Sequence, residues 1–225
     1  MNDILFGISI WLLPVLFAIT LHEAAHGYVA WKLGDDTAKQ LGRVSFNPLR
    51  HIDLWGTIIV PAVLLLSTSF VFGWAKPVPV DFGRLNNPRR DMVWVALAGP
   101  GINLAMAIFC AFMIHVAVQL PSPFDEWLFR NLRNAIYFNL ILAVFNMIPL
   151  PPLDGGRVAV GLLPRYLAYY LAGLEKYGLF IIIGLLFLLP MVGREIGMNL
   201  NIFPWLIGGP VSFLIEVIAG VAGFR

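Results

Sequence analysis

The chain has 225 residues, of which 59% are hydrophobic and only 12% are charged, whereas about 25% of a typical soluble domain is charged. This composition excludes an ordinary soluble enzyme and a disordered tail, and the small net charge of +2 leaves no basic face for a nucleic acid. A single cysteine excludes an internal disulfide framework and a cysteine-based zinc site. We therefore expect an all-α polytopic protein in a lipid bilayer, with no nucleic-acid partner.

Apolar stretches with almost no charge predict about five to six transmembrane helices. A helix of about 20 apolar residues spans a bilayer. The candidate crossings are residues 4–31, 54–75, 92–124, 134–153, 177–193 and 202–223. If the N-terminus lies outside, twelve of the fifteen Lys and Arg residues lie inside, which is the usual bias of membrane proteins.

The second stretch, residues 54–75, is predicted to enter the membrane and return between the first two core helices. Basic residues flank it on both sides, so both of its ends are expected on the inner face. Pro77 and Pro79 exclude a helix after it and favour an extended segment. Irregular backbone at this depth needs protein or a water-filled cavity around it. The alternative is a full sixth crossing with the opposite topology downstream.

The first stretch contains the sequence His22-Glu23-Ala24-Ala25-His26. On a helix, His22 and His26 share one face, and two imidazoles at that spacing can hold one divalent metal. Glu23 is poorly placed as a third ligand, but it can reach a metal-bound water and remove its proton. An ionised glutamate inside a membrane span is costly, which favours a functional role. The alternative is a pair of hydrogen-bonded core histidines with Glu23 as their counter-charge.

A catalytic zinc takes three protein ligands and keeps one position for water, so the third ligand must come from elsewhere. Asp154 follows the stretch 134–153, which runs across the membrane in the same direction as the first stretch. Asp154 is therefore expected at the same depth in the membrane as His22 and His26. Prolines unwind the helix before it, and Gly155 and Gly156 permit a close approach. The alternative role of Asp154 is the N-cap of the next helix. Glu216 is the rival third ligand.

Two asparagines and two histidines outside this group also receive predictions. Asn103, which follows Gly99 and Gly101, and Asn146 could each hold a substrate carbonyl or stabilise an oxyanion. The alternative for both asparagines is a structural hydrogen bond between helices. Of the remaining histidines, His51 is expected at the surface or the membrane interface, and His115 is expected to be a hydrogen-bonded core residue.

Three elements, residues 22–26, 99–103 and 146–155, together resemble the site-2 protease family of intramembrane zinc metalloproteases and occur in the family's order. The similarity covers about residues 4–174, and residues 72–80 are similar to the family's membrane-entering loop. The resemblance implies one zinc ion held by two histidines and an aspartate, with a glutamate as general base and an asparagine assisting substrate binding. Carried over, these residues are His22, His26, Asp154, Glu23 and Asn146.

The resemblance also implies a domain organisation and a location. The chain is similar to the minimal branch of the family in bacteria and archaea, which carries neither a PDZ nor a CBS domain. We expect a single membrane-embedded protease domain over residues 1–225, with a catalytic core at about 4–174 and C-terminal helices at about 177–223. The N-terminus would lie outside and the active site toward the cytoplasmic half of the cell membrane.

The implied activity is hydrolysis of peptide bonds within or near transmembrane segments of other membrane proteins, as in regulated intramembrane proteolysis. A zinc-bound water activated by Glu23 would attack the scissile carbonyl, and residues 74–80 could pair with the unwound substrate by strand addition. Two rival classes are a metal transporter and a non-catalytic scaffold. The absence of an internal sequence repeat disfavours a transporter, and the presence of Glu23 and Asp154 disfavours a scaffold.

Overall fold

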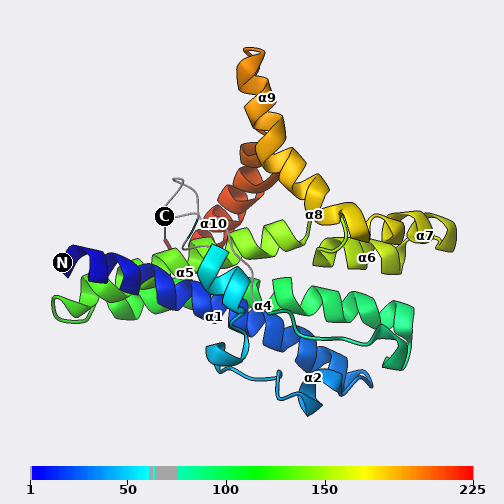
Figure 1. The fold of residues 1–225 in the computed structure, drawn as a ribbon. Helices are drawn as coiled ribbons and strands as arrows, with labels where there is room; N and C mark the ends of the chain where they lie inside the picture. The colour runs from blue at the N-terminus through cyan, green and yellow to red at the C-terminus, as the bar shows by residue number, and fades with distance from the viewer. Residues whose placement is uncertain (1, 61–62, 64–75, 225) are drawn as a thin grey trace.

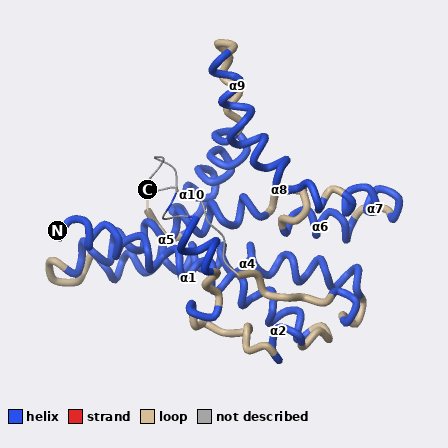
Figure 2. Tube along the Cα trace, in the orientation of Figure 1, coloured by secondary structure: helices blue, strands red, loops and turns tan. Residues whose placement is uncertain are grey.

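The structure is a computed structural model that describes residues 2–60, 63 and 76–224, and in that part of the chain it consists of helices and loops without a β-strand (Figures 1 and 2). The all-α fold predicted from the sequence is confirmed. In chain order the elements are α1 (Asn2–Lys32), α2 (Thr37–Gln40), η1 (Pro48–Arg50), η2 (Leu54–Ile59), η3 (Phe82–Arg84), α4 (Pro88–Ala117), α5 (Phe124–Asn146), α6 (Asp154–Leu162), α7 (Arg165–Gly173), α8 (Glu175–Ile183), η4 (Gly184–Leu188), α9 (Leu189–Glu195), η5 (Pro204–Gly208) and α10 (Gly209–Val221).

The helices α1, α4 and α5 form the bundle that carries the candidate site (Figure 1). The N–H of Asn86, just before α4, donates to the carbonyl of Leu33, just after α1, so α4 begins where α1 ends and runs back along it. The amide of Asn134 on α5 donates to the carbonyl of Ile10 over 2.9 Å. Because α5 starts beside the first half of α1 and runs parallel to it, the end of α5 approaches the half of α1 that carries the histidines.

Among the described residues, four helices are long and apolar enough to cross a membrane, and these are Leu5–Lys32, Pro88–Ala117, Glu175–Glu195 and Pro204–Val221. The polytopic membrane fold is thus confirmed, but two predicted crossings differ from the structure. The stretch 92–124 is replaced by α4, which ends at Ala117, and the stretch 134–153 is not among these four helices. Instead of residues 134–153, α5 covers Phe124–Asn146. It begins earlier, in a turn that carries Asp125 and Glu126, and it ends before the prolines that follow, because a proline cannot continue a helix.

The second predicted stretch, residues 54–75, is described only in part. Its start, Leu54–Ile59, forms the π-helical element η2, and apart from residues 60 and 63 the remainder lies outside the described residues. The predicted return through the membrane therefore stays a prediction. After it, residues 76–81 form no helix, in agreement with the two prolines there. The N–H of Lys76 donates to the carbonyl of His51 over 2.9 Å, so the two flanks of the stretch lie together.

The C-terminal helices are arranged differently from the bundle. The continuous helix Glu175–Glu195 projects away from α1, α4 and α5, with most of its side chains exposed (Figure 1). In contrast, α10 packs against α4 and α5 through the buried side chains Val211 and Ile218. Their partners on the bundle include Ala107 and Ala111, which are small and so allow the helices to approach closely.

Candidate metal centre

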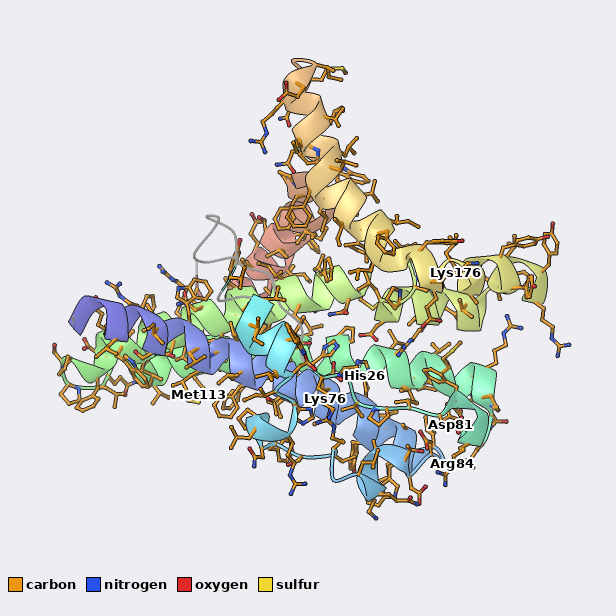
Figure 3. The ribbon with its side chains drawn as sticks, viewed as in Figure 1. His26, Lys76, Asp81, Arg84, Met113 and Lys176 are labelled. Carbon is orange, nitrogen blue, oxygen red and sulfur yellow. The ribbon has the colours of Figure 1, made fainter. Side chains whose placement is uncertain are left out.

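The two histidines of α1 face one another across a helical turn, as their spacing predicts. His22 is only 5% exposed and His26 only 9% exposed, and their Nε2 atoms lie 3.1 Å apart. The rings are edge-to-face, with centroids 4.7 Å apart. Figure 3 shows His26 in the interior, where α1 and α4 meet. Both imidazoles are thus withdrawn from the surface and aimed at one point.

The carboxylate of Asp154 completes this group from a distant part of the chain. The chain turns after α5 and begins α6 at Asp154, whose Oδ2 lies 3.2 Å from Nε2 of His22 and 3.3 Å from Nε2 of His26. The turn is tight: a Cβ on Gly155 would lie 2.2 Å from the carbonyl oxygen of Met147. Glycine therefore permits the close approach that brings Asp154, itself only 6% exposed, to the histidines.

Hydrogen bonds on the far side of each ring determine which nitrogen faces this group. Nδ1 of His22 lies 2.5 Å from Oδ1 of Asn103, and Nδ1 of His26 lies 2.7 Å from the carbonyl oxygen of Val95. Both partners are acceptors, so each Nδ1 carries a proton and donates. In a neutral ring, Nε2 then presents a lone pair, which is the form of histidine that binds metals.

The three converging atoms fit a zinc ion. Oδ2 of Asp154 is buried and accepts no hydrogen bond. Together with the Nε2 atoms of His22 and His26, it forms a group of three lone pairs that face one another with no proton between them. This arrangement is unfavourable unless a cation lies among the three atoms. Tetrahedral zinc with bonds of about 2.0–2.1 Å places its ligand atoms roughly 3.3 Å apart. The observed separations of 3.1, 3.2 and 3.3 Å match this geometry, and these residues could hold a metal ion.

Helix α4 passes so close to the imidazoles that position 99 has no room for a side chain. A Cβ on Gly99 would lie 2.5 Å from Nε2 of His26 and 2.5 Å from Cε1 of His22. A Cβ on Gly101, two residues further along, would meet nothing within 4 Å. The glycine at position 99 thus allows the backbone of α4 to cover one side of the group, while the same helix supplies both Nδ1 acceptors.

Glu23 lies next to the group and contacts a different part of the chain. Its half-buried carboxylate accepts a hydrogen bond from the backbone N–H of Val78 over 2.7 Å. The buried side chain of Val78 also packs against α1, where a Cβ on Gly27 would lie 3.0 Å from it. The extended segment 76–81 therefore runs along α1 beside the histidines, and Figure 3 shows Lys76 near His26.

Asp35 holds the far end of this segment to the end of α1. Its carboxylate accepts hydrogen bonds from the N–H of Asp81 over 2.8 Å and from the N–H of Thr37 over 3.0 Å, and the Thr37 hydroxyl donates to it as well. Burial alone raises the pKa of the Asp35 carboxyl. The three hydrogen bonds and the nearby Arg84 outweigh that effect and lower the pKa below its ordinary value.

The other predicted site residues lie in different surroundings. Asn103 is fully buried behind His22 and contacts no open space. Asn146 is half-buried in the last turn of α5, where its amide donates to the carbonyl of Leu142 over 2.9 Å. A contact of either asparagine with substrate stays a prediction. Glu216 is exposed on α10 and does not belong to the group.

One residue close to the group was not considered in the sequence analysis. Asn139 is fully buried on α5, and its Oδ1 accepts a hydrogen bond from the Asn103 amide over 2.7 Å. The available signal was a polar amide within the apolar stretch 134–153, which must find a partner when it is buried. The sequence does not show which helix supplies that partner.

The two remaining histidines lie outside the group. The expected surface position of His51 is wrong: the residue is 2% exposed, and its Nε2 lies 3.0 Å from the carbonyl oxygen of Ser45, because the preceding loop folds over it. His115 is hydrogen-bonded, as expected, but its expected core position is wrong, because the residue is exposed on α4. Its Nε2 donates to the carbonyl of Ala222 over 2.7 Å, and its ring stacks on Phe224.

Comparison with known proteins adds relatives from bacteria and archaea. "Putative zinc metalloprotease YwhC" of Bacillus subtilis is 38% identical over 183 residues, which are 80% of this chain and 80% of the relative. "Putative zinc metalloprotease Rip2" of Mycobacterium tuberculosis is 27% identical over 140 residues, 62% of this chain and 52% of the relative. "Putative zinc metalloprotease MJ0611" of Methanocaldococcus jannaschii is 39% identical over 64 residues, 28% of this chain and 31% of the relative. No family model and no solved structure matches the chain.

A group of two histidines and an aspartate buried among membrane-crossing helices defines a class of protein, the metalloenzymes embedded in membranes. With a relative that is 38% identical over 80% of its length, the chain belongs to the site-2 protease family. It is a zinc metalloprotease of the membrane, and its cofactor is zinc.

Proposed function

We propose that this protein is an intramembrane protease that hydrolyses peptide bonds within or near transmembrane segments of other membrane proteins. The observation that carries the proposal is the triangle of His22, His26 and Asp154, with sides of 3.1, 3.2 and 3.3 Å, inside a bundle of apolar helices. A group buried among helices that are long and apolar enough to cross a membrane favours a substrate segment that itself lies in the bilayer. The position of the group thus supports a transmembrane segment as the substrate class.

His22, His26 and Asp154 would hold the zinc ion in this proposal. Bound zinc supplies Lewis acidity, which polarises the scissile carbonyl and makes a water molecule acidic near neutral pH. The fourth position is left for water and substrate, since three protein ligands are typical of a catalytic zinc. The hydrogen bonds from Nδ1 of each histidine keep Nε2 unprotonated and directed at the ion.

Glu23 is the proposed general base. Its carboxylate follows His22 directly in the chain, is half-buried, and is held by the N–H of Val78. It takes a proton from the attacking water and delivers that proton to the leaving amine. The hydrogen bond from Val78 engages Oε2, so Oε1 remains available for the water.

The extended segment 76–81 is the proposed contact for the unwound substrate. The N–H groups of Lys76, Val78 and Asp81 already donate within the protein, and Pro77 and Pro79 have none. In this described segment the groups without a hydrogen bond are the N–H of Val80 and the carbonyls of residues 78–80. Pairing by strand addition would therefore rely mainly on N–H groups of the substrate.

The site is proposed to lie toward the cytoplasmic half of the membrane. The histidines occupy the second half of α1, and the positive-inside bias puts the end of α1 on the cytoplasmic side and the N-terminus outside. We further propose one membrane-embedded protease domain over residues 1–225, with its core at about 4–174. In regulated intramembrane proteolysis, its substrate would be a transmembrane segment already shortened by a first cleavage.

A cleavage assay tests the proposed function. The full-length protein in detergent is incubated with a synthetic transmembrane peptide that contains a helix-destabilising segment, and products are mapped by mass spectrometry. We expect a cut within the apolar segment, its loss with a chelator, and its recovery with added zinc. Glu23→Gln should keep zinc and lose cleavage, because the amide cannot take the proton. Cleavage by metal-free protein or by pure Glu23→Gln protein would contradict the proposal. Zinc transport by proteoliposomes or peptide binding without cleavage would support the rival classes instead.

A further inference from the structure

We propose that Asn139 is a positioning residue: it orients the Asn103 amide so that His22 keeps its proton on Nδ1 and presents Nε2 to zinc. The inference deepens the proposed function and rests on it in one respect, that His22 is a zinc ligand. Asn139 does not contact the metal group itself. It acts through Asn103, the side chain that touches His22.

Three hydrogen bonds connect a backbone carbonyl of α5 to the imidazole of His22, and a fourth holds Asn103 to α1. The Asn139 amide donates to the carbonyl of Ala135 over 2.8 Å, and its Oδ1 accepts from the Asn103 amide over 2.7 Å. The Asn103 amide also donates to the carbonyl of Ala18 over 3.2 Å. Its Oδ1, on the other side, accepts from Nδ1 of His22 over 2.5 Å. Asn103 and Asn139 are both 0% exposed.

The direction of every bond in this chain follows from its end points. Backbone carbonyls can only accept, so the carbonyl of Ala135 orients the Asn139 amide nitrogen toward itself and the Asn139 oxygen toward Asn103. The Asn103 nitrogen then faces two acceptors, Oδ1 of Asn139 and the carbonyl of Ala18. Reversing the Asn103 amide would bring its oxygen against both of them. The Asn103 oxygen is therefore left for His22.

The consequence for His22 is its tautomer. An oxygen at Nδ1 requires a proton there and leaves Nε2 free to bind a metal, whereas an NH₂ group at Nδ1 would require the opposite tautomer, with the proton on Nε2. Without Asn139, the Asn103 nitrogen loses one of its two acceptors, and the free-energy difference that favours this amide orientation becomes smaller. His26 has no such dependence, because its Nδ1 donates directly to the backbone carbonyl of Val95.

The chain offers a matched control for a test. Asn134 is another buried asparagine of α5, and its amide donates to the carbonyl of Ile10 on α1, far from the metal group. Asn139→Leu and Asn134→Leu each remove one buried amide from the same helix. A role limited to packing helices would lower the stability of both variants and leave the zinc site of both unchanged.

The experiment measures the zinc dissociation constant of each full-length protein in detergent by competition with a chelator, together with its thermal unfolding. We expect zinc binding about 10–100-fold weaker in Asn139→Leu, as for other residues that orient metal ligands, and unchanged in Asn134→Leu. Asn139→Asp retains an oxygen for Asn103 and should restore binding. In zinc-free protein with ¹⁵N-labelled histidine, of which the chain has four, His22 should lose its single tautomer only in Asn139→Leu.

Several results would overturn the inference. Wild-type zinc affinity and an unchanged His22 tautomer in Asn139→Leu would do so, as would equal losses of zinc in both leucine variants. If the leucine variants do not fold, Asn139→Ala and Asn134→Ala give the same comparison. His22→Ala separates this inference from the proposed function. If His22→Ala keeps zinc, the proposed metal site is wrong; if it loses zinc while Asn139→Leu keeps it, only the role of Asn139 is wrong.

Discussion

The backbone N–H of Val78 donates a 2.7 Å hydrogen bond to Oε2 of Glu23. This bond joins the glutamate beside the histidines to the extended segment 76–81, which follows the stretch predicted to enter the membrane. The proposed base and the proposed substrate contact are thus one structural unit, and the position of one depends on the other.

Val78→Pro tests this connection because proline has no backbone N–H and so cannot donate this hydrogen bond. The Glu23 carboxylate then loses its fixed orientation. We expect kcat to fall about tenfold or more, which is the effect of losing one hydrogen bond to a charged group, while bound zinc is unchanged. Val78→Ala is the control, since it removes the side chain but keeps the N–H. A similar fall of kcat in both variants would show that packing, and not the hydrogen bond, is what matters.

Gly99→Ala should destroy the metal centre. The added methyl group would lie 2.5 Å from Nε2 of His26, so either α4 or the imidazoles must move. Because cores tolerate such overlap poorly, we expect the purified protein to lose its zinc and its activity. Gly101→Ala adds the same methyl group to the same helix, where it meets nothing within 4 Å, and should retain both. Zinc analysis of the two variants makes the comparison, and full zinc content in Gly99→Ala would contradict the described approach of α4.

Asp35 should make the stability of the folded protein fall at acidic pH. Its pKa is lower in the folded chain than in the unfolded chain, so folding favours the ionised form. This contribution is complete above the unfolded-state pKa and is lost as the pH falls below about 4, through the lower folded-state value. The thermal unfolding midpoint of the wild type should therefore drop in that range more steeply than the midpoint of Asp35→Ala.

Asp35→Ala should also lower stability at neutral pH. It leaves the part-buried N–H groups of Thr37 and Asp81 without their charged acceptor, at a cost of about 2 kcal/mol. Asp36→Ala is the neighbouring control. Asp36 forms an exposed ion pair with Arg84, and its loss should cost less than about 1 kcal/mol. Equal destabilisation in the two variants at neutral pH would contradict the anchoring role of Asp35.

Sequence patterns were sufficient where one local rule decides the outcome. The four-residue spacing of His22 and His26 requires only a helix to bring them together, and the helix α1 extends through both. Asp154 was predictable from the direction of its stretch and from the prolines that end α5. Pro77 and Pro79 likewise exclude a helix over residues 76–81 on their own.

Contacts between distant segments could not be predicted in the same way. Asn139 is one of several asparagines in its stretch, and only the packing of α5 against α4 pairs it with Asn103. The burial of His51 depends on how the loop before it folds, and the bond between Val78 and Glu23 depends on where the extended segment lies against α1. In each case the decisive partner is dozens of residues away or belongs to a loop without periodicity.

The zinc content of purified full-length protein tests the central claim most directly. If His22, His26 and Asp154 hold the ion, the wild type should contain one zinc per chain, and Asp154→Ala should contain almost none, because two histidines alone bind zinc weakly. Glu216→Ala, which removes the exposed carboxylate of α10, should keep its zinc. Full zinc occupancy in Asp154→Ala, or its loss in Glu216→Ala, would contradict the account.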